Sequence, residues 1–321
     1  MKDTEYAYAV ARVRALENNL LSGSDIELLL TTKHVEDCIR ILSDKGYEIE
    51  GGHIEQIFQR ELGKTHDLLH EIAPDPAVFD IFSIKNDYHN LKVVLKGLST
   101  GKDFEQMLLP PVMVDVAVIK EAVTEDNFSL LPDQMAFAAQ EAYELLNRQG
   151  DSQLASVVID KASELAFYEG AKETENSFIL SLVRLMIDCN NVKTALRCAM
   201  MGKSVEYVLY ALPDVNSVSV RELAANAGTD LTALKEYLYG TEFSEGITLL
   251  DKDFSLFEKW CDDLILQKVM QARFKAFGPE PILAYLFAKE TEVKAAHIIL
   301  TGKANHVEEE MIRGRLRMLY V

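Results

Sequence analysis

The fold is decided by the stretch DIFSIKNDYHNLKVVLKGLSTGK, which runs from Asp80 to Lys102. Its apolar residues recur at steps of four and three, and this spacing predicts an amphipathic α-helix with one apolar stripe. The stripe consists of Ile84, Tyr88, Leu91, Leu95 and Leu98. The pattern returns 101 residues later as Leu185, Cys189, Val192, Leu196 and Ala199, and after 101 more as Leu286, Glu290, Val293, His297 and Leu300. We therefore interpret the chain as three divergent copies of one helical unit, with helix-stop glycines at Gly101, Gly202 and Gly302.

The repeat predicts three helical domains with boundaries at 1–105, 106–212 and 213–321. Pro110-Pro111 marks the first seam, and Pro213, with Asn216 and Ser217 nearby, marks the second. The 8 Pro and 16 Gly are few for a chain of 321 residues built from many β-turns, and Leu, Ala, Glu and Lys favour helices. The predicted fold class is all-α, and an apolar content of 48% is enough for packed cores.

Periodic segments predict where the other helices lie. A helix is expected near the start, with Ser24 or Asp25 capping the next one. A last helix is expected to carry Arg313, Arg315 and Arg317 in its final turns, where cations suit the negative end of the helix dipole. The predicted helices are Tyr6–Leu21, Ile26–Leu30, Val35–Leu42, Ile54–Ile72, Asp133–Leu146, Gln153–Glu169, Asn176–Met200, Val220–Ala227, Asp230–Tyr239, Ser255–Phe274, Pro281–Leu300 and Val307–Leu319.

The net charge of −18 argues against nucleic-acid binding, because neutralising phosphates requires clustered Lys and Arg. The charge is uneven, since residues 121–180 contain 12 acidic side chains and three basic ones. This segment is either a solvated acidic face or the complement of a basic partner surface, which would steer docking.

The four cysteines, Cys38, Cys189, Cys198 and Cys261, show no metal-type pairing and are expected to be buried thiols in a reducing cytoplasm. No signal peptide is expected from MKDTEYAYAVARVR, and no apolar run approaches the length of a membrane span.

Tests for enzyme chemistry predict no catalytic residue, cofactor site or metal site. Gly63-Lys64-Thr65 resembles the tail of a phosphate-binding loop, but Phe58 stands where that loop needs a glycine. His66 and His70 have the spacing of metal ligands on a helix, yet Asp67 replaces the glutamate of zinc proteases and no third ligand is evident. A site built from two carboxylates stays open, because the sequence does not show which carboxylates lie close together.

Glu290 and His297 interrupt the apolar stripe of the third copy. Because Ala296 can serve the stripe in place of His297, the helix face is expected to be slightly rotated; the alternative is a polar contact surface.

Three segments resemble one family, the C subunit of V/A-type rotary ATPases, whose eukaryotic counterpart is the d subunit. FSIKNDYHNLKVVLKG (Phe82–Gly97) is similar to the signature helix of that family. The other two are YAYAVARVRALENNLL (Tyr6–Leu21) and GPEPILAYLFAKETEVKAAHIILTGK (Gly278–Lys303). The family commonly has Asn and Arg where this chain has Ala295 and His297, so a contact made by that Arg would be changed here.

The resemblance implies a funnel of three helical domains around a pseudo-three-fold axis. It implies a rotor adaptor at the cytoplasmic face of the membrane, between the central shaft (subunits D and F) and the membrane rotor ring, that transmits torque for ATP-coupled proton or sodium transport. Because the shaft lacks three-fold symmetry, we expect positions shared by the copies, such as Leu91, Val192 and Val293, to be core. Partner contacts are expected where the copies differ. The alternatives are a free-standing helical repeat scaffold with a soluble partner, or a helical enzyme.

Overall fold

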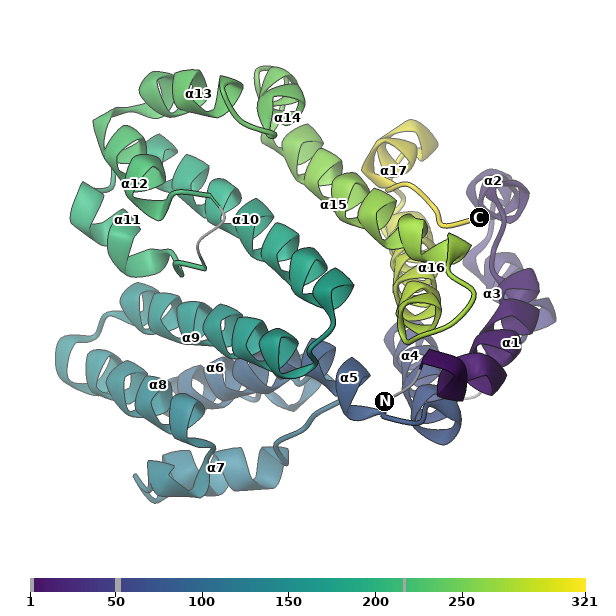
Figure 1. The fold of residues 1–321 in the computed structure, drawn as a ribbon, viewed down its shortest axis with the longest axis horizontal. Coiled ribbons are helices and arrows are strands. Elements are labelled where there is room, and N and C mark those ends of the chain that lie inside the picture. The colour runs from purple at the N-terminus through teal and green to yellow at the C-terminus, as the bar shows by residue number, and fades with distance from the viewer. Residues whose placement is uncertain (1–2, 50–52, 216–217) are drawn as a thin grey trace. The chain divides into compact units, whose positions relative to one another are not determined.

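The computed structural model describes residues 3–49, 53–215 and 218–321, and these are helical with no β-strand (Figure 1). The predicted all-α class is confirmed. The contacts divide the chain into two compact units: unit 1 is Met1–Pro76 with Glu258–Val321, and unit 2 is Ala77–Phe257. The predicted three-copy boundaries and the funnel remain predictions, and Asn216 and Ser217 at the second seam lie outside the described residues.

Unit 1 joins the two ends of the chain around α16, which packs against α4, α1, α2, α3 and α17. Its core is formed by apolar side chains such as Leu29, Leu42, Ile57 and Ile299, each 0% exposed. The helices are α1 (Ala7–Leu16), α2 (Gly23–Thr31), α3 (Val35–Asp44), α4 (Ile54–Ile72), α16 (Glu280–Ala304) and α17 (Glu309–Arg315), with 3-10 turns at Asp3–Tyr6, Glu17–Asn19 and Gln271–Phe274.

Unit 2 is built around two of the repeated helices, α6 and α10. Helix α6 packs against α7 and α9, and α10 packs against α9, α11, α12 and α13. The helices are α5 (Ala77–Asp80), α6 (Ile84–Thr100), α7 (Val116–Thr124), α8 (Asp133–Glu144), α9 (Ser152–Glu173), α10 (Ser177–Met200), α11 (Val205–Ala211), α12 (Val220–Thr229), α13 (Leu231–Tyr239) and α14 (Ser244–Leu250). Helix α15 (Phe254–Met270) begins in unit 2 and continues in unit 1.

Short turns complete unit 2. A π-helical turn at Leu145–Gln149 extends α8, and 3-10 turns lie at Ile81–Ser83, Glu105–Met107 and Phe128–Leu130.

The central stripe positions behave as the repeat predicts. Leu91 and Val192 are 0% exposed and Val293 is 5% exposed, so the positions shared by the copies are core. Leu98 is an exception, because it is 44% exposed near the end of α6. The prediction that it belongs to the buried stripe is wrong.

Two of the three predicted helix stops are confirmed. Gly101 and Gly202 adopt left-handed conformations, with φ of 63° and 62°, which glycine reaches without steric cost. Helix α16 instead continues past Gly302 to Ala304, and His306 takes the left-handed conformation (φ 55°). A Cβ at Gly302 would lie 2.7 Å from the Ile312 side chain, so glycine here permits the close approach of α17.

Both ends of the chain differ from prediction. The first segment is divided into a 3-10 turn, α1 and a second 3-10 turn, and Ser22 rather than Ser24 or Asp25 is the N-cap of α2. Ser22 and Asp25 form a reciprocal capping box. At the other end, α17 stops at Arg315, because Asp262 binds Arg317 and Asp263 accepts from the backbone N–H of Met318, which holds the tail in an extended conformation.

Candidate interaction surfaces

A polar side chain on the buried face of α6 holds the segment that follows this helix. The Asn90 side chain donates to the carbonyl of Leu109 at 3.0 Å and accepts from the backbone N–H of the same residue at 2.8 Å. One turn earlier, the Asp87 carboxylate accepts from the backbone N–H groups of Met113 and Val114, at 2.9 and 3.2 Å. Asn90 is 0% exposed and Asp87 is 2% exposed, so these bonds satisfy groups that water does not reach.

The same two positions act in the second copy. Asn191 donates to the carbonyl of Pro213 at 3.0 Å, and Asp188 accepts from the backbone N–H of Val218 at 3.2 Å. Both side chains are buried. They hold the segment that leads into α12, as Asn90 and Asp87 hold the segment that leads into α7.

In the third copy the same positions carry charged residues. Glu292 accepts from the backbone N–H of Leu21 at 2.5 Å and from the Tyr47 hydroxyl at 2.6 Å. Lys289 bridges Glu292 and Glu61, at 2.7 Å from each. Burial acts to lower the pKa of Lys289, but the two carboxylates outweigh it and raise that pKa above its usual value.

These three sets of contacts, which we name the linker clamps, share one feature, although their donors and acceptors differ. In each copy, the residue at the position of Asn90 binds the backbone of a segment that precedes a short helix: α7, α12 or α2. For the third copy this backbone is Leu21, just before α2 at the start of the chain. The third copy is therefore completed within unit 1 by the N-terminal segment.

Reasoning from the sequence misses the linker clamps. The signal that could find them is the recurrence of polar residues at the 101-residue spacing, Asn90, Asn191 and Glu292, inside a helix whose neighbours are apolar. A polar residue kept at a core position requires a partner.

Replacing Asp87 with asparagine is expected to raise the free energy of unfolding at about pH 7.5 and to leave it nearly unchanged near pH 4. Burial raises the pKa of Asp87 to about 6, although the N–H groups of Val114 and Met113 act to lower it. The unfolded value is about 4, so the folded chain binds the proton more tightly and loses stability as the pH rises from about 4 to 6. Asparagine keeps an oxygen acceptor and removes this loss of roughly 2–3 kcal/mol.

Urea denaturation of both chains across this pH range measures the effect. Exposed Asp126, changed to asparagine, serves as the control and should show no such difference. A D87N chain that follows the pH dependence of the parent would contradict the assignment.

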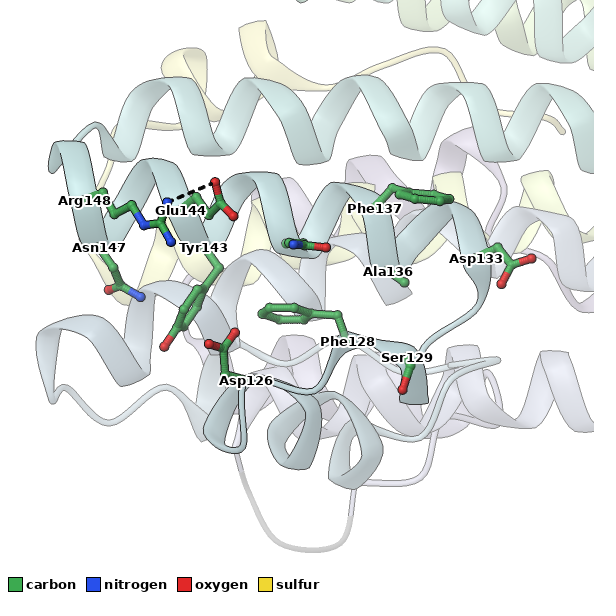
Figure 2. A pocket seen from close by; sticks show the side chains of 11 residues that line it. Asp126, Phe128, Ser129, Asp133, Ala136, Phe137, Tyr143, Glu144, Asn147 and Arg148 are labelled. Carbon is green, nitrogen blue, oxygen red and sulfur yellow. Dashed lines mark ion pairs between the residues drawn. The ribbon is translucent and has the colours of Figure 1, made fainter.

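An open groove runs along α8 in unit 2 (Figure 2). We call it the α8 groove; its volume is about 520 Å³. Figure 2 shows Phe128 and Tyr143 between α8 and the segment that carries Asp126 and Ser129. The rings of Phe128 and Tyr143 meet edge to face, with centroids 5.4 Å apart. The groove is lined by Asp126, Phe128, Ser129, Asp133, Ala136, Phe137, Gln140, Tyr143, Glu144, Asn147 and Arg148.

The α8 groove carries more negative than positive charge. Its one lining cation, Arg148, lies 3.8 Å from Glu144. Asp126 and Asp133 are exposed, and neither forms an ion pair within the described part of the chain. Phe137 is 76% exposed, which is unusual for an aromatic side chain.

A second hollow of about 310 Å³ lies on another side of Phe137, between α8, α9 and Tyr210 of α11. The Tyr210 hydroxyl donates to Glu141. Lys161 donates to the carbonyls of Leu209 and Tyr210, at 3.3 and 2.9 Å, so its ammonium is committed to the end of α11. The rest of the lining is mostly apolar, and it includes Ala138, Val158, Ala162 and Leu165.

The Gly63-Lys64-Thr65 segment, which the sequence pattern excludes as a phosphate-binding loop, and the two histidines all lie on α4. Gly63 and Lys64 are in the middle of this helix, so the segment is not a loop. The imidazole rings of His66 and His70 lie 4.3 Å apart by centroid, as spacing of four on a helix predicts. That no metal binds there stays a prediction.

The slight rotation of the α16 face is confirmed. Ala296 is 0% exposed and takes the stripe position, whereas His297 is half-buried and lies 2.9 Å from Glu55. His297 also contacts the Phe58 ring edge to face, with centroids 5.4 Å apart. Glu290 is exposed.

The arginines near the C-terminus have different roles. Arg313 forms a two-bond ion pair with Glu27 of α2, and Arg317 binds Asp262. Arg317 lies beyond the end of α17, so the predicted dipole role does not apply to it. The four cysteines are all buried thiols, as predicted. Burial raises the pKa of Cys38 and of Cys198.

The fold and its surfaces define an all-helical protein whose repeated helices are tied to their linkers by buried polar clamps. The chain belongs to the ATP synthase (C/AC39) subunit family, whose model matches residues 9–315. It is 25% identical to the C subunit of the V-type sodium ATPase of Enterococcus hirae, over 98% of this chain and 99% of that protein.

Two archaeal relatives are similar to the same extent. The C subunit of the A-type ATP synthase of Methanocaldococcus jannaschii is 24% identical, over 97% of this chain and 86% of that protein. The corresponding protein of Haloferax volcanii is 25% identical, over 97% of both. None of the described helices combines the length and the apolar character that crossing a bilayer requires.

Proposed function

We propose that this chain is the C subunit of a V/A-type rotary ATPase and acts as its non-catalytic rotor adaptor. In this role it links the central shaft, made by subunits D and F, to the membrane rotor ring at the cytoplasmic face. It transmits torque between ATP turnover and ion transport. The observation that carries the proposal is the family match over residues 9–315, together with relatives that align along nearly their whole length. A free-standing scaffold would have no reason to keep this full-length similarity.

The linker clamps support a role in which the chain transmits torque. Each clamp joins a repeated helix to the backbone of another segment through buried polar bonds, and such fully satisfied networks rigidify a core. An adaptor that transmits torque needs units whose internal structure does not deform under that torque. It also needs broad contacts, and we expect each partner face to bury more than roughly 1,000 Å² in total.

Partner contacts are expected at exposed positions that the three copies do not share. The most exposed large apolar side chains are candidates, and they include Phe274 (89% exposed), Phe137 (76%) and Tyr8 (68%). The shared positions Leu91, Val192 and Val293 are buried and are not available for contact.

Co-elution of the chain with the purified shaft pair on a sizing column tests the proposal. A stable complex is expected at low salt, and weaker retention at moderate salt if exposed charges steer the contact. The run is repeated with the detergent-purified ring, so that a shaft contact that forms only on the ring is also detected. Elution of the chain alone in every run would contradict the adaptor role.

A further inference from the structure

We propose that the α8 groove, with Phe137 at its edge, is the docking site for a basic amphipathic helix of another subunit of the rotary ATPase. This inference rests on the proposed function, because it takes the partner from the same complex. It goes beyond that function by naming the surface and the chemistry of the segment that binds there.

The negative charge of the groove favours a partner segment that carries Lys or Arg. Asp126 and Asp133 are exposed and unpaired within the described residues, and the one lining cation, Arg148, already faces Glu144. A partner that brings Lys or Arg side chains gains two open carboxylates. Nucleic acid and an anionic lipid surface would be repelled by the same groups. A second copy of this chain would oppose one acidic face with another.

The exposed Phe137 ring and the depressions beside it favour an amphipathic helix as the partner segment. Phe137 contributes to both the α8 groove and the neighbouring hollow by Tyr210, so an aromatic ridge separates two depressions. A helix lying along α8 places apolar side chains against this ridge and cations over the carboxylates, as helices bound in grooves do. Along α8 and its π-helical extension the groove spans residues 133–148, or about 23 Å of helix, which matches roughly four turns of a partner.

Lys161 does not compensate the acidic charge beside the ridge. It binds the carbonyls that end α11, and burial lowers its pKa below the usual range. Residues 121–180 contain 12 acidic and three basic side chains, so the groove lies in the most acidic part of the chain. This wider field increases the rate at which a basic segment encounters the groove.

The experiment places the photo-cross-linker benzoylphenylalanine at position 137 of the full chain within the purified ATPase complex. Because Phe137 is 76% exposed, the substitution disturbs little packing. Irradiation followed by peptide mass spectrometry is expected to show one cross-linked segment, helical and rich in Lys or Arg, from another subunit. The same probe at Tyr239 of α13, which is 44% exposed, should give no link to that segment.

Charge reversal tests the electrostatic part. The double variant Asp126→Lys with Asp133→Lys is expected to reduce the yield of that cross-link by about ten-fold or more. The matched control is Glu121→Lys with Glu173→Lys, which makes the same change in net charge at exposed positions outside the groove. That control should change the yield less than about two-fold.

Several results would overturn the proposal. These are a complex that contains the chain but gives no cross-link at position 137, or a cross-link to lipid, to a second copy or to a segment without cations. Equal effects of the two charge-reversal variants on the cross-link yield would also overturn the proposal. A complex from which the chain is absent would overturn the adaptor role as well, so the two failures are distinguishable.

Discussion

Replacing Lys289 with methionine is expected to lower the free energy of unfolding by about 3–5 kcal/mol. The Lys289 side chain is 9% exposed and bridges Glu61 and Glu292, whose side chains are 10% and 3% exposed. Without the ammonium, two buried carboxylates face each other with no compensating charge. The loss therefore reflects the cost of leaving these charges unpaired, not the net strength of the ion pair.

Urea denaturation followed by circular dichroism measures this loss. Lys294→Met on the same helix is the control, because the Lys294 side chain is 56% exposed and its contact with Asp262 at 3.2 Å is a surface ion pair. Its removal should cost less than about 1 kcal/mol. Adding Glu61→Gln and Glu292→Gln to the Lys289 variant is expected to restore much of the stability. A Lys289 variant as stable as its Lys294 control would contradict the buried network.

The second large effect is expected at the centre of the repeated helix. Leu91→Ala should lower the free energy of unfolding by about 2–5 kcal/mol, because it leaves a cavity in the core of unit 2. Leu91 is 0% exposed and lies among Val94, Leu95 and Ile119. The loss depends on how far the surrounding side chains can relax into the space.

Leu98→Ala is the matched control, since Leu98 is the same residue type on the same helix and the sequence pattern assigns it to the same stripe. It is 44% exposed, so its truncation should cost less than about 1 kcal/mol. The denaturation midpoints of the two variants, measured in one buffer, give the two stability losses to be compared. Equal losses would show that burial in solution follows the sequence pattern and not the structure described.

Long periodic helices are predicted well from the sequence, whereas the shortest helices are missed. The predicted and observed bounds of α4 are identical, Ile54–Ile72, because a long apolar stripe ends at a Pro-containing turn. Helices α11 and α14 have seven residues each and escape prediction, since two turns carry too little periodicity to recognise. The predicted N-cap of α2 lies two or three residues late, although Ser22 and Asp25 have the spacing of a capping box.

The tail and the linker clamps depend on tertiary contacts. The extended tail after α17 is held by Asp262 and Asp263, which lie 55 residues away in sequence from the groups they bind. The helix and strand propensities of the tail residues carry no information about partners so distant in sequence. The clamp residues are visible as repeated polar positions, but the backbone groups that they bind belong to segments with no helical or strand pattern. For the α8 groove, the acidic excess of residues 121–180 is visible in the sequence, whereas the exposure of Phe137 is not.

The most direct test of the adaptor role is whether the chain bridges two partners that do not otherwise bind. An affinity-tagged rotor ring in detergent is mixed with the purified shaft pair, with and without this chain, and the material retained with the ring is measured. The account predicts that the shaft pair is retained only when the chain is present, in equal molar amounts with it. Retention of the shaft pair without the chain, or its loss when the chain is bound to the ring, would contradict the account.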